Sequence, residues 1–486
     1  MTLILLAFAV GFNYFVGFYY SVVSVLYTAL LSIALVVILR HLHRVRYEPF
    51  REYSASPQTP SVSILIPAYN EEKVVIRTVR SALAVDYPLF EVIVINDGSD
   101  DGTREAVIDA FGLKKIDLVY RNALRTMPVR GFYYNPDMPN LLLIDKAKSG
   151  KADSLNCGIA MSRSPYFCSL DADSLLEKDS LIKLMTPIMQ SHVPVIACGG
   201  VVKIVNGVAL KDIAITEIKL PPRSLPLFQI VEYARTFLFG RMGWSALNSL
   251  LILSGAFSLF SKTAVLEVGG YRTENTSEDM EIIVRLHKHY LRKKKPYRIK
   301  FISDPICWTE VPESMKMLGR QRRRWHLGLL QTLFQNKSML FNPRYGRIGL
   351  LVFPYYVFFE ALGPVIELAG YVVVAFSFYL GLVSPDFLLL FLTLAIFYGV
   401  FLSIAGVFLA ELTYRRYPKW SHLMKLLWYA VLENFCYRQI NSFWRSQAFF
   451  QFLRGKTAWE HVAGKGADAT GEGSRSGAHY NEEVRG

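Results

Sequence analysis

Long apolar runs near both ends of the chain flank a middle region in which the apolar runs are short. Residues 1–39 contain no Asp, Glu, Lys or Arg. A helix that crosses a bilayer needs roughly 20 apolar residues, so this segment predicts one span and leaves room for a second, shorter one. Residues 368–385 and 387–410 are also free of charge, and each is long enough for a further span. The pattern predicts membrane segments on both sides of a soluble region.

The soluble region alternates strand-length apolar runs with helical patterns. We expect strands at 62–66, 92–95, 141–144 and 166–170, and helices at 72–85, 103–111 and 151–161. Buried strands that alternate with helices are typical of a parallel, doubly wound α/β sheet.

Three other segments are less regular. Residues 203–250 carry an amphipathic, aromatic stretch that suits the membrane interface or ordinary core packing. Residues 423–453 are aromatic but charged, so we expect an interfacial or bundle-packed helix. Residues 464–486 are rich in Gly, Ser and charge and are predicted to be disordered. The expected domains are membrane segments at 1–46, a soluble domain at 60–335, membrane and interfacial helices at 345–455, and a tail at 456–486.

Charge and composition indicate the compartment of the soluble domain and the kind of ligand that it binds. Hydrophobic residues make up 52% of the chain, and the net charge is +14. Basic residues at 40–46 come directly after the first apolar run and favour a cytoplasmic location for the soluble domain, in a cell membrane crossed more than once. The first run lacks a basic start and a small-residue cleavage site, which favours a retained segment. Anionic headgroups and a nucleotide diphosphate explain the positive charge better than nucleic acid does. The five cysteines show no ligand-like spacing, which fits a reducing compartment without zinc.

Acidic residues follow three of the predicted strands. Glu71, Asp97 and the pair Asp171 and Asp173 all lie just beyond a strand. Functional loops of such sheets lie beyond the carboxyl ends of the strands, so these side chains should converge on one edge. Asp171 and Asp173 suit Mg²⁺ or Mn²⁺, which would neutralise a leaving diphosphate, although a solvated turn is the plain alternative. No Gly-x-Gly-x-x-Gly follows a strand, which argues against a dinucleotide site.

Two neighbouring features suit a nucleotide. Asp97 either forms an Asp-Gly turn or accepts a hydrogen bond from a base or ribose. Lys148 and Lys151 stand at a predicted helix start, where ammonium and backbone N–H groups would hold phosphates. A plain basic cap is disfavoured there, because cations are unfavourable at a helix N-terminus.

Two later clusters supply candidate catalytic and acceptor groups. Glu278 and Asp279 open a predicted helix, where they either cap it or provide a general base that deprotonates a hydroxyl. Gln321, Arg324 and Trp325 lie in a basic run that suits either a membrane surface or a site in which a sugar stacks on indole.

These motifs, in this order, resemble processive family 2 glycosyltransferases, the group of bacterial hyaluronan, cellulose, chitin and poly-N-acetylglucosamine synthases. The resemblance covers roughly residues 60–460. The matching residues are Pro67-Ala68-Tyr69-Asn70-Glu71, Asn96 to Ser99, Gly150 to Ala152 with Leu155-Asn156, Asp171-Ala172-Asp173, Ser254-Gly255-Ala256, Glu278-Asp279, and Gln321 with Arg324-Trp325.

The resemblance implies a GT-A fold, a UDP-sugar donor, Mg²⁺ or Mn²⁺, inversion at the anomeric carbon and export of a growing polysaccharide. UDP-N-acetylglucosamine and UDP-glucose are the expected donors. By residue, the resemblance implies a nucleotide-sugar site at Ala68, Tyr69, Glu71, Asp97, Lys148, Lys151 and Asp171; a metal site at Asp171 and Asp173; a base at Asp279; and an acceptor site at Ser254, Gly255, Glu278, Gln321, Arg324 and Trp325.

The sequence departs from the family at two places. Ser277 stands where Thr is usual. Lys456 and Trp459 match part of a gating loop, but the small residue and Thr that should come next are missing. No C-terminal cyclic-dinucleotide domain is visible.

Our interpretation is a membrane-embedded, processive, inverting β-glycosyltransferase. The alternatives are transfer of one sugar to a lipid and, less favoured, a non-catalytic membrane scaffold. Glu360 and Glu367 lie two helical turns apart on one face, which predicts either the mouth of a polysaccharide channel or a position among lipid headgroups.

Overall fold

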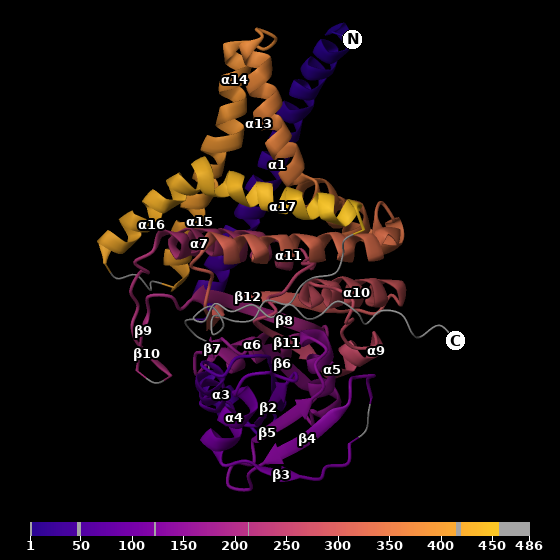
Figure 1. The fold of residues 1–486 in the computed structure, drawn as a ribbon, viewed down its shortest axis with the longest axis vertical. Helices are drawn as coiled ribbons and strands as arrows, with labels where there is room; N and C mark the ends of the chain where they lie inside the picture. The colour runs from indigo at the N-terminus through magenta and orange to yellow at the C-terminus, as the bar shows by residue number, and fades with distance from the viewer. Residues whose placement is uncertain (1, 46–49, 121–122, 212, 415–418, 456–486) are drawn as a thin grey trace.

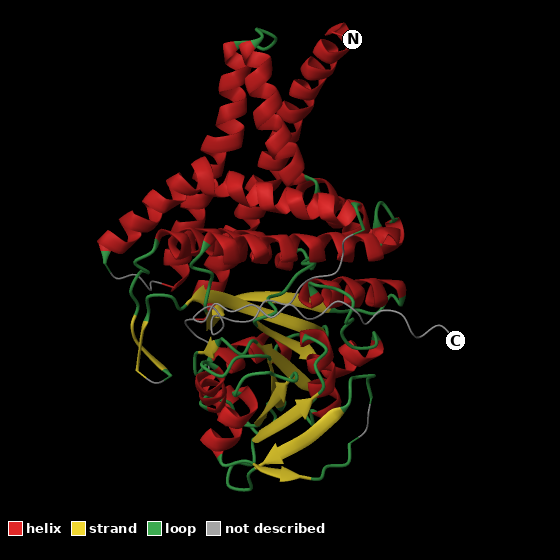
Figure 2. Ribbon diagram, in the orientation of Figure 1, coloured by secondary structure: helices red, strands yellow, loops and turns green. Residues whose placement is uncertain are grey.

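The computed structural model describes residues 2–45, 50–120, 123–211, 213–414 and 419–455. Figure 1 shows a layered arrangement: at one end lie the long apolar helices that the sequence predicts to span a membrane, which we call the spanning helices. A layer of helices lies across them, and the sheet domain lies below. Figure 2 separates the helical layers from the strands. Lys456, Trp459 and the tail predicted to be disordered fall outside the described residues.

A mixed sheet forms the core of the soluble domain. Its strand order is β3-β4-β5-β2-β1-β6-β11-β8-β12-β7. A separate two-stranded ribbon pairs β9 with β10. The strands are β1 (Val62–Ala68), β2 (Phe90–Asn96), β3 (Lys114–Ile116), β4 (Val129–Tyr134), β5 (Leu141–Lys146), β6 (Tyr166–Leu170), β7 (Leu175–Leu176), β8 (Val195–Ile204), β9 (Ala209–Lys211), β10 (Ala214–Glu217), β11 (Phe257–Ser261) and β12 (Arg298–Thr309).

The prediction of a parallel sheet is confirmed only for the four central strands. Strands β5, β2, β1 and β6 are parallel, whereas β11 runs antiparallel to both β6 and β8. The connection explains the reversal. After β8 the chain enters the crossing helices beyond the carboxyl edge of the sheet, and it returns into β11 from that same edge. As a result, residues 254–256 lie directly beside Asp171, whose N–H donates to the Ala256 carbonyl at 3.4 Å.

Helices flank the sheet in the soluble domain. Local sequence signals mark the ends of two of them: Gly112, in a left-handed conformation, ends α4, and Ser277 precedes the acidic first turn of α10. The helices of this domain are α2 (Phe50–Ala55), α3 (Val75–Leu83), α4 (Thr103–Phe111), α5 (Lys151–Met161), α6 (Ser180–Met189), α9 (Lys262–Glu267) and α10 (Glu278–Arg292).

A layer of crossing helices connects the sheet domain with the spanning helices (Figure 1). The irregular stretch 203–250 forms part of it: α7 packs against α15 and α16, while η1 and α8 pack against α1. Helix α17 lies along α11. The members of this layer are α7 (Ser224–Arg235), η1 (Thr236–Arg241), α8 (Met242–Ala246), α11 (Met315–Gln335), α16 (Trp420–Leu432), η7 (Glu433–Tyr437) and α17 (Arg438–Leu453).

The apolar segments form long helices. Helix α1 (Thr2–Val45) is continuous, so the second N-terminal span is not formed. In the described part of the chain, two helices are long and apolar enough to cross a membrane, 6–43 and 385–413, and a bent pair adds a third. That pair bends by 47° between 348–361 and 363–379; Pro364, at the start of the second helix, accounts for the bend. These helices comprise η4 (Ile348–Val352), α12 (Phe353–Tyr355), η5 (Tyr356–Ala361), α13 (Gly363–Tyr379), α14 (Pro385–Leu392), η6 (Thr393–Phe397) and α15 (Tyr398–Tyr414).

Candidate active site

One cavity of about 610 Å³ joins the edge of the sheet to the spanning helices. At the sheet edge it is lined by Asp171 and Asp173. At the other end it reaches Glu360 and Glu367 of the bent helix pair and Tyr19 of α1. We call it the active-site cavity. Most of the predicted site residues line it, namely Lys151, Asp171, Asp173, Ser254, Gly255, Glu278, Asp279, Gln321, Arg324 and Trp325.

Asp97 is held by hydrogen bonds from the chain itself. Its side chain is buried, and its oxygens accept hydrogen bonds from Lys146 Nζ at 2.7 Å, the Ser149 N–H at 3.0 Å and the Gly150 N–H at 2.6 Å. The Asp97 N–H in turn donates to the Ala68 carbonyl at 2.9 Å. Asp97 therefore fixes the loop that carries Lys148 and Lys151. Direct contact between Asp97 and a nucleotide stays a prediction.

A shelf formed by Tyr69 and Lys148 lies on the outer side of that loop. The Tyr69 hydroxyl donates to Asp100 at 2.8 Å, and Lys148 Nζ lies 4.1 Å from the centre of the Tyr69 ring. Gly98 allows the loop to approach: its φ is +62°, and an added Cβ would lie 2.8 Å from the Lys148 backbone nitrogen. A half-buried aromatic ring beside an ammonium group suits a base and its phosphates.

Lys151 links the sheet edge to the start of α10. Its Nζ lies 2.5 Å from Asp171 and 3.2 Å from Glu278, and it donates to the Gly255 carbonyl at 3.1 Å. Burial alone would lower the pKa of Lys151, but the charges of Asp171 and Glu278 outweigh it and raise the pKa. Lys151 is therefore a fixed cation between the candidate diphosphate and acceptor positions.

Carboxylates at the sheet edge crowd one another. Burial, with added repulsion from Asp173 and Asp171, raises the pKa of Glu71 to about 8. Burial and the charge of Asp171 raise the pKa of Asp173 to about 6. No group of three or more His, Cys, Asp or Glu side chains in the described residues is arranged to hold a metal ion. Two oxygen-donor carboxylates with excess negative charge nevertheless fit a hard divalent cation whose other ligands come from a diphosphate.

Asp279 lies across the cavity from this edge. It accepts hydrogen bonds from the Ser277 hydroxyl at 2.7 Å and from the Met280 N–H at 2.8 Å. Burial and the adjacent charge of Glu278 raise the pKa of Asp279. Gly255 lies close by, because an added Cβ there would be 2.9 Å from Lys151 Nζ and 3.6 Å from Asp279. A carboxylate with a raised pKa beside open space suits a general base.

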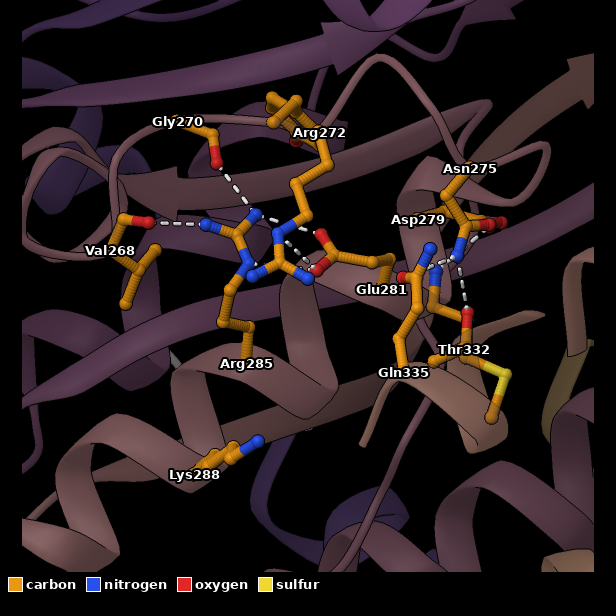
Figure 3. A network of polar contacts seen from close by, with 12 residues as sticks. Val268, Gly270, Arg272, Asn275, Asp279, Glu281, Arg285, Lys288, Thr332 and Gln335 are labelled. Atoms are coloured by element: carbon orange, nitrogen blue, oxygen red, sulfur yellow. Dashed lines mark hydrogen bonds and ion pairs between the residues drawn. The ribbon is translucent and has the colours of Figure 1, made fainter. Parts of the chain in front are cut away.

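A buried polar network holds the loop that leads to Asp279 (Figure 3). Glu281, fully buried, pairs with Arg285 at 2.7 Å, and Arg285 also donates to the Gly270 carbonyl at 2.7 Å. At the other end of the loop, Asn275 donates to Thr332 of α11 at 3.0 Å. Sequence reasoning missed this network, although the spacing of Glu281 and Arg285 by four residues on a helix was a visible signal.

Helix α11 presents the predicted acceptor residues on one face, since Gln321, Arg324 and Trp325 are three and four residues apart. Trp325 is 39% exposed, and the Arg322 guanidinium lies 4.6 Å from its ring centre. The Gln321 Oε1 is buried without a hydrogen-bond partner among the described residues. The geometry places a stacking surface and an unsatisfied acceptor atom on the cavity wall.

The far wall consists of ion pairs between different helices. Glu360 pairs with Arg445 at 3.2 Å, and Glu367 pairs with Arg438 at 3.0 Å. Both glutamates line the cavity, so the predicted shared face exists. Two further pairs complete the wall, Arg235 with Glu433 at 2.9 Å and Arg322 with Glu232 at 2.6 Å. The arginine partners were not predicted. Glutamates and arginines within the apolar segments of the sequence were a signal that such charges would pair with one another.

Comparison with known proteins agrees with this architecture. The family model described as "Glycosyl transferase family group 2" matches residues 166–432, and "Glycosyl transferase family 2" matches residues 63–124. The first match covers more than half of the chain. This protein is a family 2 glycosyltransferase. Its soluble domain has the GT-A fold, and the resemblance stated from the motifs is confirmed.

Individual relatives are more distant. The chain is 28% identical over 283 residues to a poly-beta-1,6-N-acetyl-D-glucosamine synthase of Staphylococcus epidermidis, a match that covers 58% of each chain. It is 27% identical over 290 residues to the protein of that name from Staphylococcus aureus, covering 58% of this chain and 59% of the relative. The chain thus spans less than two thirds of the length of these curated relatives.

Among solved structures, the chain is similar to a mannosyltransferase, PcManGT of Pyrobaculum calidifontis, in complex with GDP-Man and Mn²⁺. It is 18% identical with a TM-score of 0.48, covering 84% of this chain and 99% of the other. TarS of S. aureus (residues 1–349), in complex with UDP-GlcNAc, is 16% identical with a TM-score of 0.37, covering 81% and 92%.

Proposed function

We propose that this glycosyltransferase polymerises a neutral sugar from a UDP-sugar donor and passes the glycan toward its own spanning helices. The observation that carries the proposal is the single cavity that runs from the carboxylates of the sheet edge, past Asp279 and Trp325, to Glu360 and Glu367. A transferase that releases its product after one step needs no such continuous path.

The donor is expected at the strand-end loops. Tyr69 and Lys148 form the base and phosphate shelf, and Lys151 faces the diphosphate beside Asp171. A UDP-sugar, with UDP-N-acetylglucosamine first and UDP-glucose second, agrees with the names of the relatives. Lys151 would offset the charge that develops on UDP as it leaves.

The chemical step is a direct displacement. Asp279 takes the proton from an acceptor hydroxyl, whose oxygen forms a bond to the anomeric carbon. The bond between that carbon and the diphosphate oxygen breaks, and UDP leaves with the electron pair. Attack from the face opposite UDP inverts the anomeric centre. General base catalysis of this kind contributes about 10²- to 10⁴-fold.

Asp171 and Asp173 are the residues that would hold Mg²⁺ or Mn²⁺. The bound cation supplies charge neutralisation to the diphosphate. Their fit rests on the donor chemistry described above: both offer carboxylate oxygens, and Asp173 and Glu71 are buried beside further carboxylates, which raises the pKa of each.

The acceptor end is expected against α11. Trp325 offers a stacking surface for the terminal sugar, and Gln321 offers an unpaired acceptor atom. The ion pairs of the far wall offer both donors and acceptors to the hydroxyl groups of the units behind. The basic residues directly after the first apolar run favour a cytoplasmic position for the sheet domain.

Purified protein in lipid nanodiscs tests the proposal. With UDP-N-acetylglucosamine or UDP-glucose and Mn²⁺ or Mg²⁺, the expected result is UDP release together with a glycan of many units. A product that consists only of a singly glycosylated lipid would support lipid transfer instead. Absence of any UDP release with every UDP-sugar tested would support a scaffold without activity.

A further inference from the structure

Arg241 lies in the active-site cavity at the end of η1, a π-helical segment. Such segments occur frequently at functional sites. Its guanidinium lies 4.1 Å from the Phe237 ring centre and 5.9 Å from that of Phe301. These rings hold the side chain in the wall without neutralising its charge.

Arg241 differs from four other arginines of the cavity. Arg235, Arg322, Arg438 and Arg445 each pair with a glutamate at 2.6–3.2 Å. The Nε and Nη1 of Arg241 are buried and have no hydrogen-bond partner within the described part of the chain. Burial lowers the pKa of Arg241 to about 10, and the nearby charge of Asp279 opposes that effect. A buried donor without an acceptor is unfavourable unless a ligand supplies one.

Space for such a ligand lies beside it. Gly240 also lines the cavity, and an added Cβ there would meet nothing within 4 Å. Trp244 and Tyr356 border the same cavity and offer aromatic surface. Arg241 and Asp279 line the same cavity, and the charge of Asp279 acts on Arg241.

We propose that Arg241 binds the acceptor glycan, donating hydrogen bonds to the neutral oxygens of a sugar unit behind the one that Asp279 deprotonates. The inference rests on the proposed function. Hydroxyl and N-acetyl carbonyl oxygens are acceptors that match an arginine with unpaired N–H groups.

The test compares Arg241→Met with Arg241→Lys and, as a control outside the cavity lining, with Lys219→Met. The probe is a β-linked N-acetylglucosamine tetrasaccharide, and its binding is measured by calorimetry on the whole protein in nanodiscs. Loss of charge-assisted hydrogen bonds should weaken tetrasaccharide binding by roughly 10- to 100-fold in Arg241→Met. Arg241→Lys keeps the positive charge but loses the planar guanidinium group, so its affinity for the tetrasaccharide should lie between those of the wild type and Arg241→Met. The KM for UDP-N-acetylglucosamine should stay within about twofold, because the donor is held elsewhere.

Thermal unfolding separates binding from structure. Arg241→Met removes an unpaired buried charge, so the melting temperature should stay the same or rise. Arg235→Met leaves the buried Glu433 without its cation, so the melting temperature should fall. Equal tetrasaccharide binding in wild type and both Arg241 variants would overturn the inference, as would no binding by the wild type. A rise in donor KM without an acceptor effect would also overturn it and assign Arg241 to the diphosphate. If the wild type binds the oligosaccharide but extends nothing, the proposed function fails and the inference stands.

Discussion

The two ends of the active-site cavity are built in different ways. At the sheet edge, charged side chains come from loops directly after strands, and burial together with the charges of neighbouring carboxylates raises the pKa of Glu71 and Asp173. At the membrane end, charges come from helices far apart in the sequence, such as Arg235 and Glu433, and each glutamate has an arginine partner.

This difference indicates that the two ends of the cavity bind different ligands. An edge with surplus negative charge suits a cation and, through Lys151, a diphosphate. The four arginine–glutamate pairs of the membrane end suit a neutral glycan, because paired charges offer hydrogen-bond donors and acceptors to its hydroxyl groups. Asp279 lies between the two ends, where donor and acceptor must meet.

The largest effect is expected where the two ends meet. Asp279→Asn removes the proton acceptor but keeps the size of the side chain and an oxygen for the Met280 N–H. Turnover, measured as UDP release, should fall by about 10²- to 10⁴-fold while UDP binding persists. Near-normal turnover would assign the base to another residue.

Breaking one membrane-side pair should cost stability. Arg235→Met leaves Glu433, which is 1% exposed, without its cation. Removing one partner of a buried pair typically costs about 3–5 kcal/mol. Denaturant unfolding in detergent measures the loss. Lys219→Met, which breaks an exposed pair with Glu217, is the matched control and should change little. An equally small loss in both variants would show that the wall contributes no stability.

Trp325→Ala should affect the acceptor far more than the donor. Losing about 1–3 kcal/mol of stacking corresponds to roughly 5- to 150-fold weaker retention of the growing end. Products should shorten on a sizing gel while donor hydrolysis to UDP persists. Products of unchanged length would remove Trp325 from the acceptor site.

The sheet edge should respond to pH. Cation binding needs deprotonated carboxylates, and Glu71 and Asp173 titrate near pH 8 and 6. Affinity for Mn²⁺ with UDP should therefore rise between pH 6 and 8, by about tenfold per pH unit for each proton displaced. Without ligand, the sign reverses: the folded state binds more protons than the unfolded state, so stability falls as pH rises through this window. Calorimetry at several pH values measures the first effect, and Glu71→Gln should flatten its upper part.

Local signals explain what the sequence predicted correctly. Helices at 103–111 and 151–161 and the strand at 166–170 match the structure, because glycines at helix ends and short apolar runs act over a few residues. Glu71, Asp171 and Asp173 lie near one another at the sheet edge, because the parallel strands β1 and β6 end there.

Long-range packing explains what the sequence did not predict. The reversal of β11 depends on an excursion of about fifty residues through the crossing helices. Asp97 bonds to the loop that carries Lys148 and Lys151 because Lys146, forty-nine residues after Asp97, comes to lie beside it. The partners of Glu360 and Glu367 lie on α17, and nothing within a local window identifies them.

The central claim is that the glycan elongates through this one cavity. Gly240→Cys places a thiol at an open position of its wall, and the native Cys436, exposed and absent from the cavity lining, is an internal control. Labelling by a water-soluble maleimide is followed during synthesis. We predict that UDP-N-acetylglucosamine slows labelling at residue 240 in an active background but not with Asp279→Asn, and that Cys436 is labelled at the same rate throughout. Labelling at residue 240 that is unaffected by ongoing polymer synthesis would contradict the account.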